Sequence, residues 1–390
     1  VELDGMRVRP AVVEVAPGEH VVLRVTNRED VRHDLRVDGG PRTPMLRRDE
    51  TALLDVGPVA DELAARCTVA GHRAAGMTLT LRASGTHRHG AHDNNPDNTD
   101  NTDDAGMDPA ADPSPGWIAR DARLAPASTE TTHRVELHVV EQEVEVAPGI
   151  RQRAWTFGGT APGPALRGKV GDHFEVTLVN DGSIGHSIDF HAGALAPEGP
   201  MRTIEPGERL VYRFTANRPG AWLYHCGTMP MSQHVANGMY GAVVIDPPDL
   251  PPADDEFLLV ASQLYLGDPG DDARAARIRA GAPDGWAFNG MAGQYDHAPL
   301  TTAVGRRVRI WLVDAGPGDG LAFHVVGGQF DAVYREGARW PTTGAQALDL
   351  APSQGGYVEL IFPEAGRYPF VDHDLRHAER GAHGFVDVAG

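Results

Sequence analysis

The sequence predicts an all-β protein built from three β-sandwich domains, and three observations support this. The chain of 390 residues is longer than one typical hydrophobic core. Its 46 glycines and 30 prolines favour short strands joined by tight turns. Three segments alternate with period two, as half-buried strands do, and end in Asn or Asp. They read GEHVVLRVTN from Gly18, GDHFEVTLVN from Gly171 and GRRVRIWLVD from Gly305. Similarity at this spacing indicates repeated domains, and short strands with Gly/Pro turns indicate antiparallel sandwiches.

The domains are predicted at residues 1–83, 117–248 and 249–390. Between the first two, residues 84–116 hold seven Asp, one Arg and little apolar surface. Such a segment cannot bury enough area to offset its ordering entropy, so it is expected to be a flexible linker. Three histidines of this segment are read as part of a solvated linker and not as a metal site: His87, His89 and His92.

Two further features organise the second half of the chain. The joint at 246–255 reads DPPDLPPADD and is stiffened by proline, so the second and third domains are expected to pack as one body. Residues 268–283 predict one helix, with acidic residues at its start and Gly281 at its end.

Composition limits the kinds of partner. The formal net charge of −19 makes nucleic acid an unfavourable ligand, while a basic protein could dock on such a surface. The apolar fraction of 41% and the charged fraction of 23% are typical of globular proteins. No apolar run approaches the ~18 residues of a membrane-spanning helix.

The two cysteines each lie in a separate cluster of histidine and methionine. A disulfide between Cys67 and Cys226 would leave both clusters unexplained, whereas thiolate ligation of a soft metal explains both. A histidine also follows the alternating strand in each of these two domains. His33 and His186 lie six residues beyond Asn27 and Asn180, respectively.

The predicted ligand sets are His33, Cys67, His72 and Met77 in the first domain, and His186, Cys226, His234 and Met239 in the second. Two imidazoles, a thiolate and a weak axial thioether form a blue-copper (type 1) electron-transfer site. Taken singly, each residue is more simply a core side chain. However, both cysteines occur in the same arrangement with two histidines and a methionine, which argues against coincidence. Met229 and Met231 are expected to pack within the loop instead of binding metal.

Several motifs resemble those of the copper-containing nitrite reductases. They are HSIDFHAGALAP, YHCGTMPMSQHVANGMYGAVVID, FHVVGGQFDAVY and FVDHDLRHAERGAHG. The resemblance runs from about Trp155 to the C-terminus, and residues 1–83 resemble a plastocyanin-type cupredoxin. It implies three cupredoxin-like Greek-key β-sandwiches, two type 1 coppers and one type 2 copper per chain, and reduction of nitrite to nitric oxide.

The resemblance also implies the type 2 ligands, which are His191, His225 and His373. Three imidazoles leave a coordination position open for a small anion. Because His225 is bonded directly to Cys226, ligands of the two metals share one peptide link. The remaining C-terminal histidines, His377 and His383, are read as members of a polar loop.

Reduction of nitrite to nitric oxide and water consumes one electron and two protons. The resemblance assigns the proton-handling roles to Asp189 and His324, and places Val326 over the substrate. Asp189 and His191 are two residues apart, so on a strand they face the same side. The alternative for Asp189 is a turn-capping residue, and for His324 a histidine bonded to backbone.

The third domain has no cysteine and therefore no predicted blue site. In the family that the chain resembles, His324 and His373 complete the type 2 site of a neighbouring chain in a homotrimer. An external electron donor is expected, and the N-terminal cupredoxin either passes electrons to the core or receives them from outside. An extracytoplasmic location is expected, whether periplasmic, secreted or tethered to the cell surface.

Two other functions compete with this reading. A small multicopper oxidase that reduces oxygen needs His-x-His pairs and a histidine on each side of the type 1 cysteine, but Cys226 is followed by Gly227. A non-catalytic blue-copper protein needs only the two type 1 sites, and then Asp189 and His324 would have no role.

Overall fold

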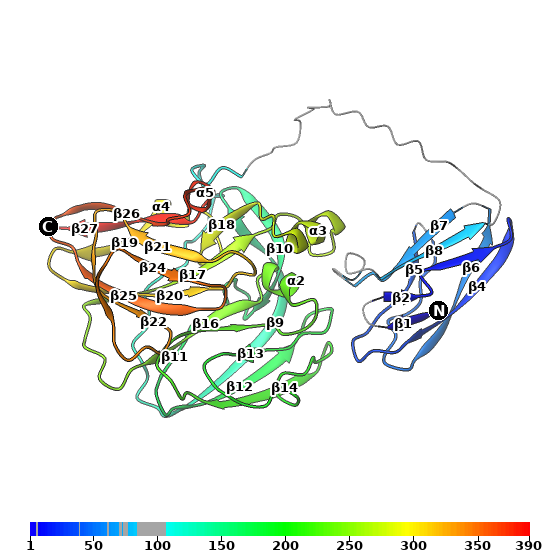
Figure 1. The fold of residues 1–390 in the computed structure, drawn as a ribbon, viewed down its shortest axis with the longest axis horizontal. Coiled ribbons are helices and arrows are strands. Elements are labelled where there is room, and N and C mark those ends of the chain that lie inside the picture. Colours follow the sequence, from blue (N-terminus) through cyan, green and yellow to red (C-terminus); the bar gives the residue numbers. More distant parts are fainter. Residues whose placement is uncertain (5–6, 39, 61, 70–71, 73–76, 84–106) are drawn as a thin grey trace. The chain divides into compact units, whose positions relative to one another are not determined.

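The computed structural model describes residues 1–4, 7–38, 40–60, 62–69, 72, 77–83 and 107–390 (Figure 1). The predicted all-β class is confirmed, because sheets dominate these residues. The chain divides into two compact units, one comprising Val1–Gly106 and Gly270–Ala275 and the other comprising Met107–Pro269 and Ala276–Gly390. Most of the predicted linker, with its three histidines, lies outside the described residues.

The N-terminal domain is a sandwich of two four-stranded sheets, ordered β2-β1-β4-β6 and β3-β8-β7-β5. The strands are β1 (Glu2–Asp4), β2 (Arg7–Arg9), β3 (Val12–Val15), β4 (Glu19–Asn27), β5 (Arg36–Val37), β6 (Thr51–Val59), β7 (Glu62–Arg66) and β8 (Thr78–Ala83). The alternation predicted for β4 sets its two faces. Val21, Leu23 and Val25 enter the core, whereas Val22 is 51% exposed.

The second domain repeats this plan with sheets β10-β9-β12-β14 and β11-β16-β15-β13. Its strands are β9 (Thr132–Ala147), β10 (Ile150–Phe157), β11 (Leu166–Lys169), β12 (His173–Asn180), β13 (Asp189–Phe190), β14 (Arg209–Thr215), β15 (Gly220–His225) and β16 (Tyr240–Asp246). The short helix α2 (Met231–Ala236) interrupts the connection from β15 to β16. This connection carries the predicted cysteine-histidine-methionine loop.

The third domain packs a six-stranded sheet, β18-β17-β20-β25-β22-β23, on a five-stranded sheet, β19-β27-β26-β21-β24. Its strands are β17 (Asp255–Leu264), β18 (Gly285–Phe288), β19 (Ala298–Ala303), β20 (Arg307–Asp314), β21 (Leu321–Val325), β22 (Phe330–Arg335), β23 (Thr342–Ala345), β24 (Ala347–Leu350), β25 (Gly355–Ile361), β26 (Gly366–Asp372) and β27 (His383–Ala389). Three helices flank the sheets: α3 (Asp272–Ala280), α4 (Gln294–His297) and α5 (Leu375–Glu379).

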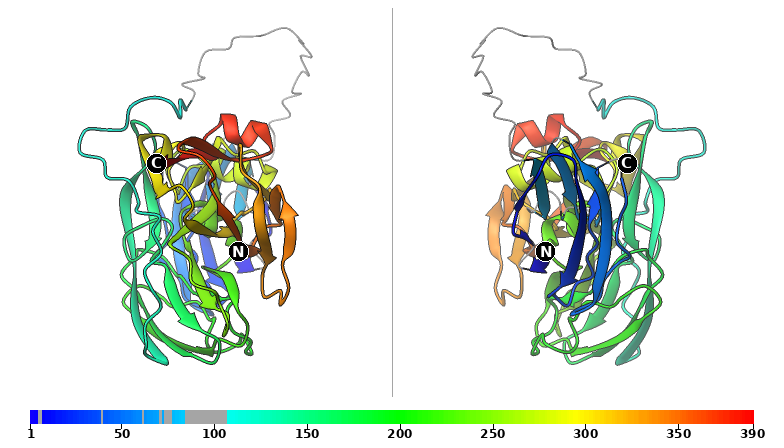
Figure 2. Two further views of the ribbon diagram at one scale, coloured as in Figure 1. Left: turned by 90° about the vertical axis from the view of Figure 1, so that its left-hand side faces the viewer. Right: turned by 90° about the vertical axis from the view of Figure 1, so that its right-hand side faces the viewer.

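The second and third domains share a buried apolar interface. Leu223 and Tyr240 of the second domain belong to one core cluster with Leu258, Trp311 and Tyr357 of the third. In the side views the green strands of the second domain lie beside the yellow-to-red strands of the third (Figure 2). Burial of large aromatic side chains is a strong source of stabilisation, so these two domains form one unit.

The three predicted strands correspond to β4, β12 and β20, and the predicted helix corresponds to α3, so these predictions are confirmed. The sequence did not reveal the short helices α2, α4 and α5, because one or two turns carry too little periodicity. The last part of the predicted linker also differs from expectation. Met107 packs against an apolar cluster that contains Val146, and the amide of Ser114 donates to Glu145. None of the helices in the described part of the chain is long and apolar enough to cross a membrane.

Candidate metal centres

The first cluster brings three predicted ligands together in the N-terminal domain. His33 follows β4, Cys67 follows β7, and both are buried with His72. The Nδ1 atoms of the two histidines lie 3.0 Å apart, and the thiol of Cys67 lies 3.5 Å from Nδ1 of His72 and 3.9 Å from that of His33. Met77 is fully buried, and its carbonyl accepts a hydrogen bond from the amide of Cys67.

The second cluster has nearly the same dimensions. Nδ1 of His186 lies 3.2 Å from Nδ1 of His234, and the thiol of Cys226 lies 3.3 Å from His234 and 3.9 Å from His186. His234 is presented by α2, and Met239 is fully buried beyond it. The backbone repeats as well, because the amide of Cys226 donates to the carbonyl of Met239. The indole of Trp155 packs on both imidazoles.

The donor geometry fits a metal ion in both clusters. Ligand atoms held about 2 Å from one ion stand about 3 to 4 Å from one another, which matches the spacings above. Burial lowers the pKa values of His33, His186 and His234, in the last case to about 3, so these imidazoles are neutral and can bind metal. A thiolate with two imidazoles is a donor set that suits copper.

The thiols of the two clusters differ electrostatically. Burial raises the pKa of Cys67 to about 12, and the nearby carboxyl of Asp34 adds to the shift. Burial acts in the same direction on Cys226, but hydrogen bonds from His186 and from backbone amides outweigh it and lower its pKa. Among these amides is that of Ser187, whose nitrogen lies 3.4 Å from the sulfur. The second cluster therefore stabilises the thiolate more than the first.

A third group lies on the neighbouring strands β13 and β15, where Asp189 pairs with His225 in register. Nε2 of His191 lies 3.1 Å from Nε2 of His225 and 3.7 Å from a carboxylate oxygen of Asp189. Nδ1 of His225 is 2.9 Å from the carbonyl of Cys226 and donates its proton there, which leaves Nε2 free to bind a metal. Each of the three side chains is partly accessible to solvent.

His324 and His373 lie together in the third domain, and Val326 is two residues beyond His324 in the sequence. The rings of His324 and His373 have centroids 5.4 Å apart, and Nδ1 of His324 donates to the carbonyl of Gln346. His373 is exposed and Val326 is 44% exposed. No metal-binding group in the described part of the chain includes His373. One chain thus brings Asp189, His191 and His225 together without the third predicted type 2 ligand.

Sequence reasoning missed one polar contact of this group. The hydroxyl of Tyr212, on β14, donates to Oδ1 of Asp189 at 3.4 Å. Burial raises the pKa of Tyr212, with the charge of Asp189 adding to the shift, so the tyrosine is a neutral donor. In the sequence, Tyr212 stands at an inward-facing position of an alternating strand. A hydroxyl at such a position requires a hydrogen-bond partner, and this is the only sequence signal for the contact.

The other C-terminal histidines have structural partners. His377 donates to Asp372 at 2.7 Å and stacks on Trp286, and His383 lies 2.8 Å from Asp296. The prediction that they belong to a polar loop is wrong, because His377 is buried in α5 and His383 begins β27, although each has a polar partner.

Met229 and Met231 do not pack within the loop as predicted. They are 52% and 45% exposed. The loop is short, and its interior is already filled by the buried side chains of α2.

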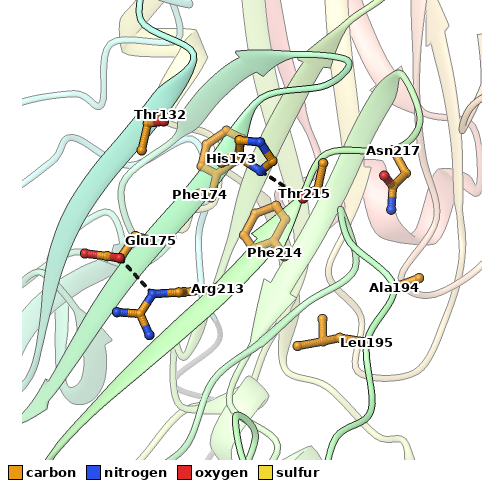
Figure 3. A pocket seen from close by; sticks show the side chains of 10 residues that line it. All are labelled: Thr132, His173, Phe174, Glu175, Ala194, Leu195, Arg213, Phe214, Thr215 and Asn217. Atoms are coloured by element: carbon orange, nitrogen blue, oxygen red, sulfur yellow. Dashed lines mark hydrogen bonds and ion pairs between the residues drawn. The ribbon is translucent and has the colours of Figure 1, made fainter.

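A surface cavity of about 530 Å³ opens on β12 and β14 of the second domain. Its wall carries a hydrogen bond between Nδ1 of His173 and the hydroxyl of Thr215, and an ion pair between Glu175 and Arg213 (Figure 3). None of the predicted site residues lines it. The cavity is therefore separate from the three histidine groups.

Comparisons with known proteins find multicopper oxidases and copper-containing nitrite reductases. A sequence model of the multicopper oxidase family matches residues 138–250. The copper-containing nitrite reductase of Neisseria gonorrhoeae is 34% identical over 272 residues, which are 66% of this chain and 68% of that protein. The solved copper nitrite reductase from Nitrosomonas europaea is 37% identical with a TM-score of 0.63, covering 66% of this chain and 94% of the other. A copper-containing nitrite reductase from Thermus scotoductus is 27% identical with a TM-score of 0.62, covering 66% and 62% of the two chains.

Proposed function

The chain belongs to the copper-containing nitrite reductases, which use copper to reduce nitrite to nitric oxide, and on this premise we propose the roles of its residues. The observation that carries the proposal is the position of His225. It turns toward His191, whereas the next residue, Cys226, turns toward His186 and His234. Two adjacent residues, the last of β15 and the one that follows it, therefore face two different groups of candidate metal ligands.

Copper is supported by the family, and we propose three ions per chain. Two type 1 ions would be held by the sets His33, Cys67, His72, Met77 and His186, Cys226, His234, Met239, whose histidines and cysteines converge. One type 2 ion would be held by His191 and His225, which also converge, together with His373 of a neighbouring chain. When bound, the type 1 ions supply one-electron transfer, and the type 2 ion supplies an open position for the anion.

The protein connects the two kinds of site through one peptide bond. The electron path begins at Cys226 of the type 1 site and ends at His225 of the type 2 site. The hydrogen bond from Nδ1 of His225 to the carbonyl of Cys226 holds the imidazole in one tautomer and orientation. The backbone thus supplies a short covalent route for the electron.

Asp189 and His324 are proposed to handle the two protons. The carboxyl group of Asp189 lies 3.7 Å from Nε2 of His191, so in its protonated form it can donate a hydrogen bond, and then the proton, to a nitrite oxygen held beside that imidazole. Tyr212 orients this carboxylate by donating to its other oxygen. His324 is oriented by its bond to Gln346, which leaves Nε2 facing outward to exchange a proton with water. Val326 is proposed as the apolar contact over the anion.

The separation of the two groups supports a shared site. Within one chain, the group of possible metal ligands that contains His191 and His225 includes neither His373 nor His324. The side chain of His373 is exposed. A homotrimer in which each exposed pair reaches the neighbouring chain's Asp189 group would complete three sites. Monomers would then lack one type 2 ligand.

The electron donor and the location are part of the proposal. The acidic chain, with net charge −19, suits a basic redox protein or a small reductant as the external donor. An extracytoplasmic location is proposed from three features together: both cysteines are used for copper, the chain is acidic, and it belongs to the copper-containing nitrite reductases. The multicopper-oxidase alternative is not favoured, since Cys226 has a histidine on one side only.

The direct test is anaerobic turnover. Copper-loaded protein receives an artificial one-electron reductant and nitrite, and nitric oxide is measured with an electrode. Electron paramagnetic resonance of the same sample counts type 1 and type 2 copper. Nitric oxide formation with two type 1 signals and one type 2 signal per chain supports the proposal. Oxygen consumption without nitric oxide would contradict it.

A further inference from the structure

The two blue sites are surrounded by matching loops, which permits a comparison inside one chain. In the N-terminal domain the side-chain amide of Asn27 donates to the carbonyls of Val31 and Leu46, and its oxygen accepts from the amide of Glu29. The loop then delivers His33, which pairs with Leu46 as an isolated bridge.

The second domain repeats these contacts with the same spacing. Asn180 donates to the carbonyls of Ile184 and Ile204 and accepts from the amide of Gly182. His186 pairs with Ile204 as an isolated bridge. Hence Gly182 occupies the position that Glu29 occupies in the first domain.

This difference changes what the outer nitrogen of the first histidine ligand contacts. Nε2 of His33 lies 2.6 Å from the carboxylate of Glu29 and donates to it, and the imidazole is fully buried. Nε2 of His186 is buried and has no hydrogen-bond partner among the described residues. A Cβ built at Gly182 would lie 3.5 Å from this nitrogen, so the missing side chain is the one that would face it.

A second sequence difference between the two sites also places more negative charge near the first site. The residue after His33 is Asp34, whose buried carboxylate accepts from the amide and hydroxyl of Thr68 at 2.6 Å each. The matching residue after His186 is Ser187, whose hydroxyl accepts from the amide of Gly227 at 3.0 Å. The first site therefore has two carboxylates where the second has a glycine and a hydroxyl.

Glu141 adds negative charge near His186 of the second site, but this charge is already compensated. Glu141 accepts from the amide and hydroxyl of Ser183 and pairs with Arg153. It makes no hydrogen bond to Nε2 of His186. The difference in charge between the two sites thus remains.

We propose that Glu29, supported by Asp34, lowers the reduction potential of the N-terminal copper below that of the core copper, which makes the N-terminal domain the electron donor of the pair. A carboxylate that accepts from a ligating imidazole makes it more electron-donating. Nearby negative charge in a buried site also favours the more positive ion, Cu(II). In the resulting step one electron leaves Cu(I) at the first site and reduces Cu(II) at the second, and no proton moves. An external one-electron reductant then reduces the first site again.

This inference rests on the proposed type 1 sites, and its test is a redox titration without nitrite. The full copper-loaded chain is titrated spectroelectrochemically, with Cys67→Ser and Cys226→Ser each used to isolate the other blue band. The first site is expected to be reduced at a lower potential than the second. The opposite order would overturn the proposal, whatever the variants show.

Glu29→Gln then isolates the charge, because the amide oxygen can still accept from His33. At a fixed applied potential the Cu(I):Cu(II) ratio of the first site is expected to rise at least about tenfold, equivalent to 59 mV for a one-electron couple. The matched control is Glu14→Gln, an exposed carboxylate of the same domain that is paired with Arg82. It is expected to change the ratio less than about twofold. An equal response in both variants would overturn the role of Glu29.

Gly182→Glu adds a carboxylate at the matching position of the second site. This variant tests the effect of the carboxylate on the reduction potential even if Glu29→Gln fails to bind copper. It is expected to lower the Cu(I):Cu(II) ratio of the second site about tenfold, whereas Gly182→Gln, which matches its size, is expected to change it much less. If Gly182→Glu and Gly182→Gln changed the Cu(I):Cu(II) ratio equally, the proposal would be contradicted. Nitric oxide formation with an artificial reductant is measured in parallel on the unmodified protein. Its absence would refute the nitrite-reductase roles while leaving the measured order of potentials to stand.

Discussion

The imidazole of His225 and the thiol of Cys226 face opposite sides of the backbone where β15 ends. Nε2 of His225 lies 3.1 Å from His191, and the sulfur of Cys226 lies 3.3 Å from Nδ1 of His234. Successive residues of a strand point to opposite faces, so one strand end can serve two metal sites. The geometry follows from the sequence pair His-Cys and from the pairing of β15 with β13.

Replacement of these neighbours should therefore separate the two metals. His225→Ala is expected to lose nitrite turnover and the type 2 resonance while both blue bands remain. Cys226→Ser is expected to lose turnover and one blue band while the type 2 resonance remains. Each loss should exceed about 100-fold, because every electron must pass both positions. Joint loss of both signals in either variant would contradict the division of roles.

Asp189→Asn tests the carboxylate as a proton-handling group. The amide keeps the shape but cannot donate the proton, so nitric oxide formation is expected to fall about 10²- to 10⁴-fold with normal copper content. Tyr212→Phe is the matched control, because it removes only the hydroxyl that orients Asp189. It is expected to cost less than about tenfold. A comparable loss in both variants would indicate that the pair has a structural role only.

The shared site can be tested by complementation between chains. His191→Gln and His373→Gln damage different halves, so each protein alone should be nearly inactive. When the two are unfolded together and refolded, random assembly of a ring is expected to restore about a quarter of the wild-type turnover per site. A site that is complete within one chain would show no recovery. Size-exclusion chromatography of the mixture confirms that the chains have assembled.

Most of the fold and the convergence of each cysteine with two histidines could be predicted from sequence, because they depend on local patterns. Strand alternation predicted β4, β12 and β20, and the short spacings from Cys67 and Cys226 to their histidines bring each thiol close to an imidazole. Contacts made across sheets could not be predicted. Tyr212 reaches Asp189 from a different strand, and no residue spacing records that approach.

The last prediction concerns a buried carboxyl outside these sites. Asp314 is 3% exposed, and one of its oxygens accepts from the amide of Gly316 at 3.0 Å. Burial raises its pKa to about 8, and the negative charges of Asp372 and Asp319 act in the same direction. An unfolded aspartate has a pKa of about 3.9, so between these values the folded chain keeps a proton that the unfolded chain releases.

The stabilisation from this proton is complete below about pH 4 and is lost as the pH rises toward about 8. Asp314→Asn carries no charge at any pH, so it should unfold at the same temperature as the wild type near pH 4 and at a higher temperature near pH 8. Differential scanning calorimetry across this range measures the divergence. The control is Asp331→Asn, which changes an exposed residue of β22. Its unfolding temperature should follow that of the wild type at every pH. If the unfolding temperature of Asp314→Asn also follows that of the wild type at every pH, then Asp314 is ionised in the folded protein and its buried charge is compensated.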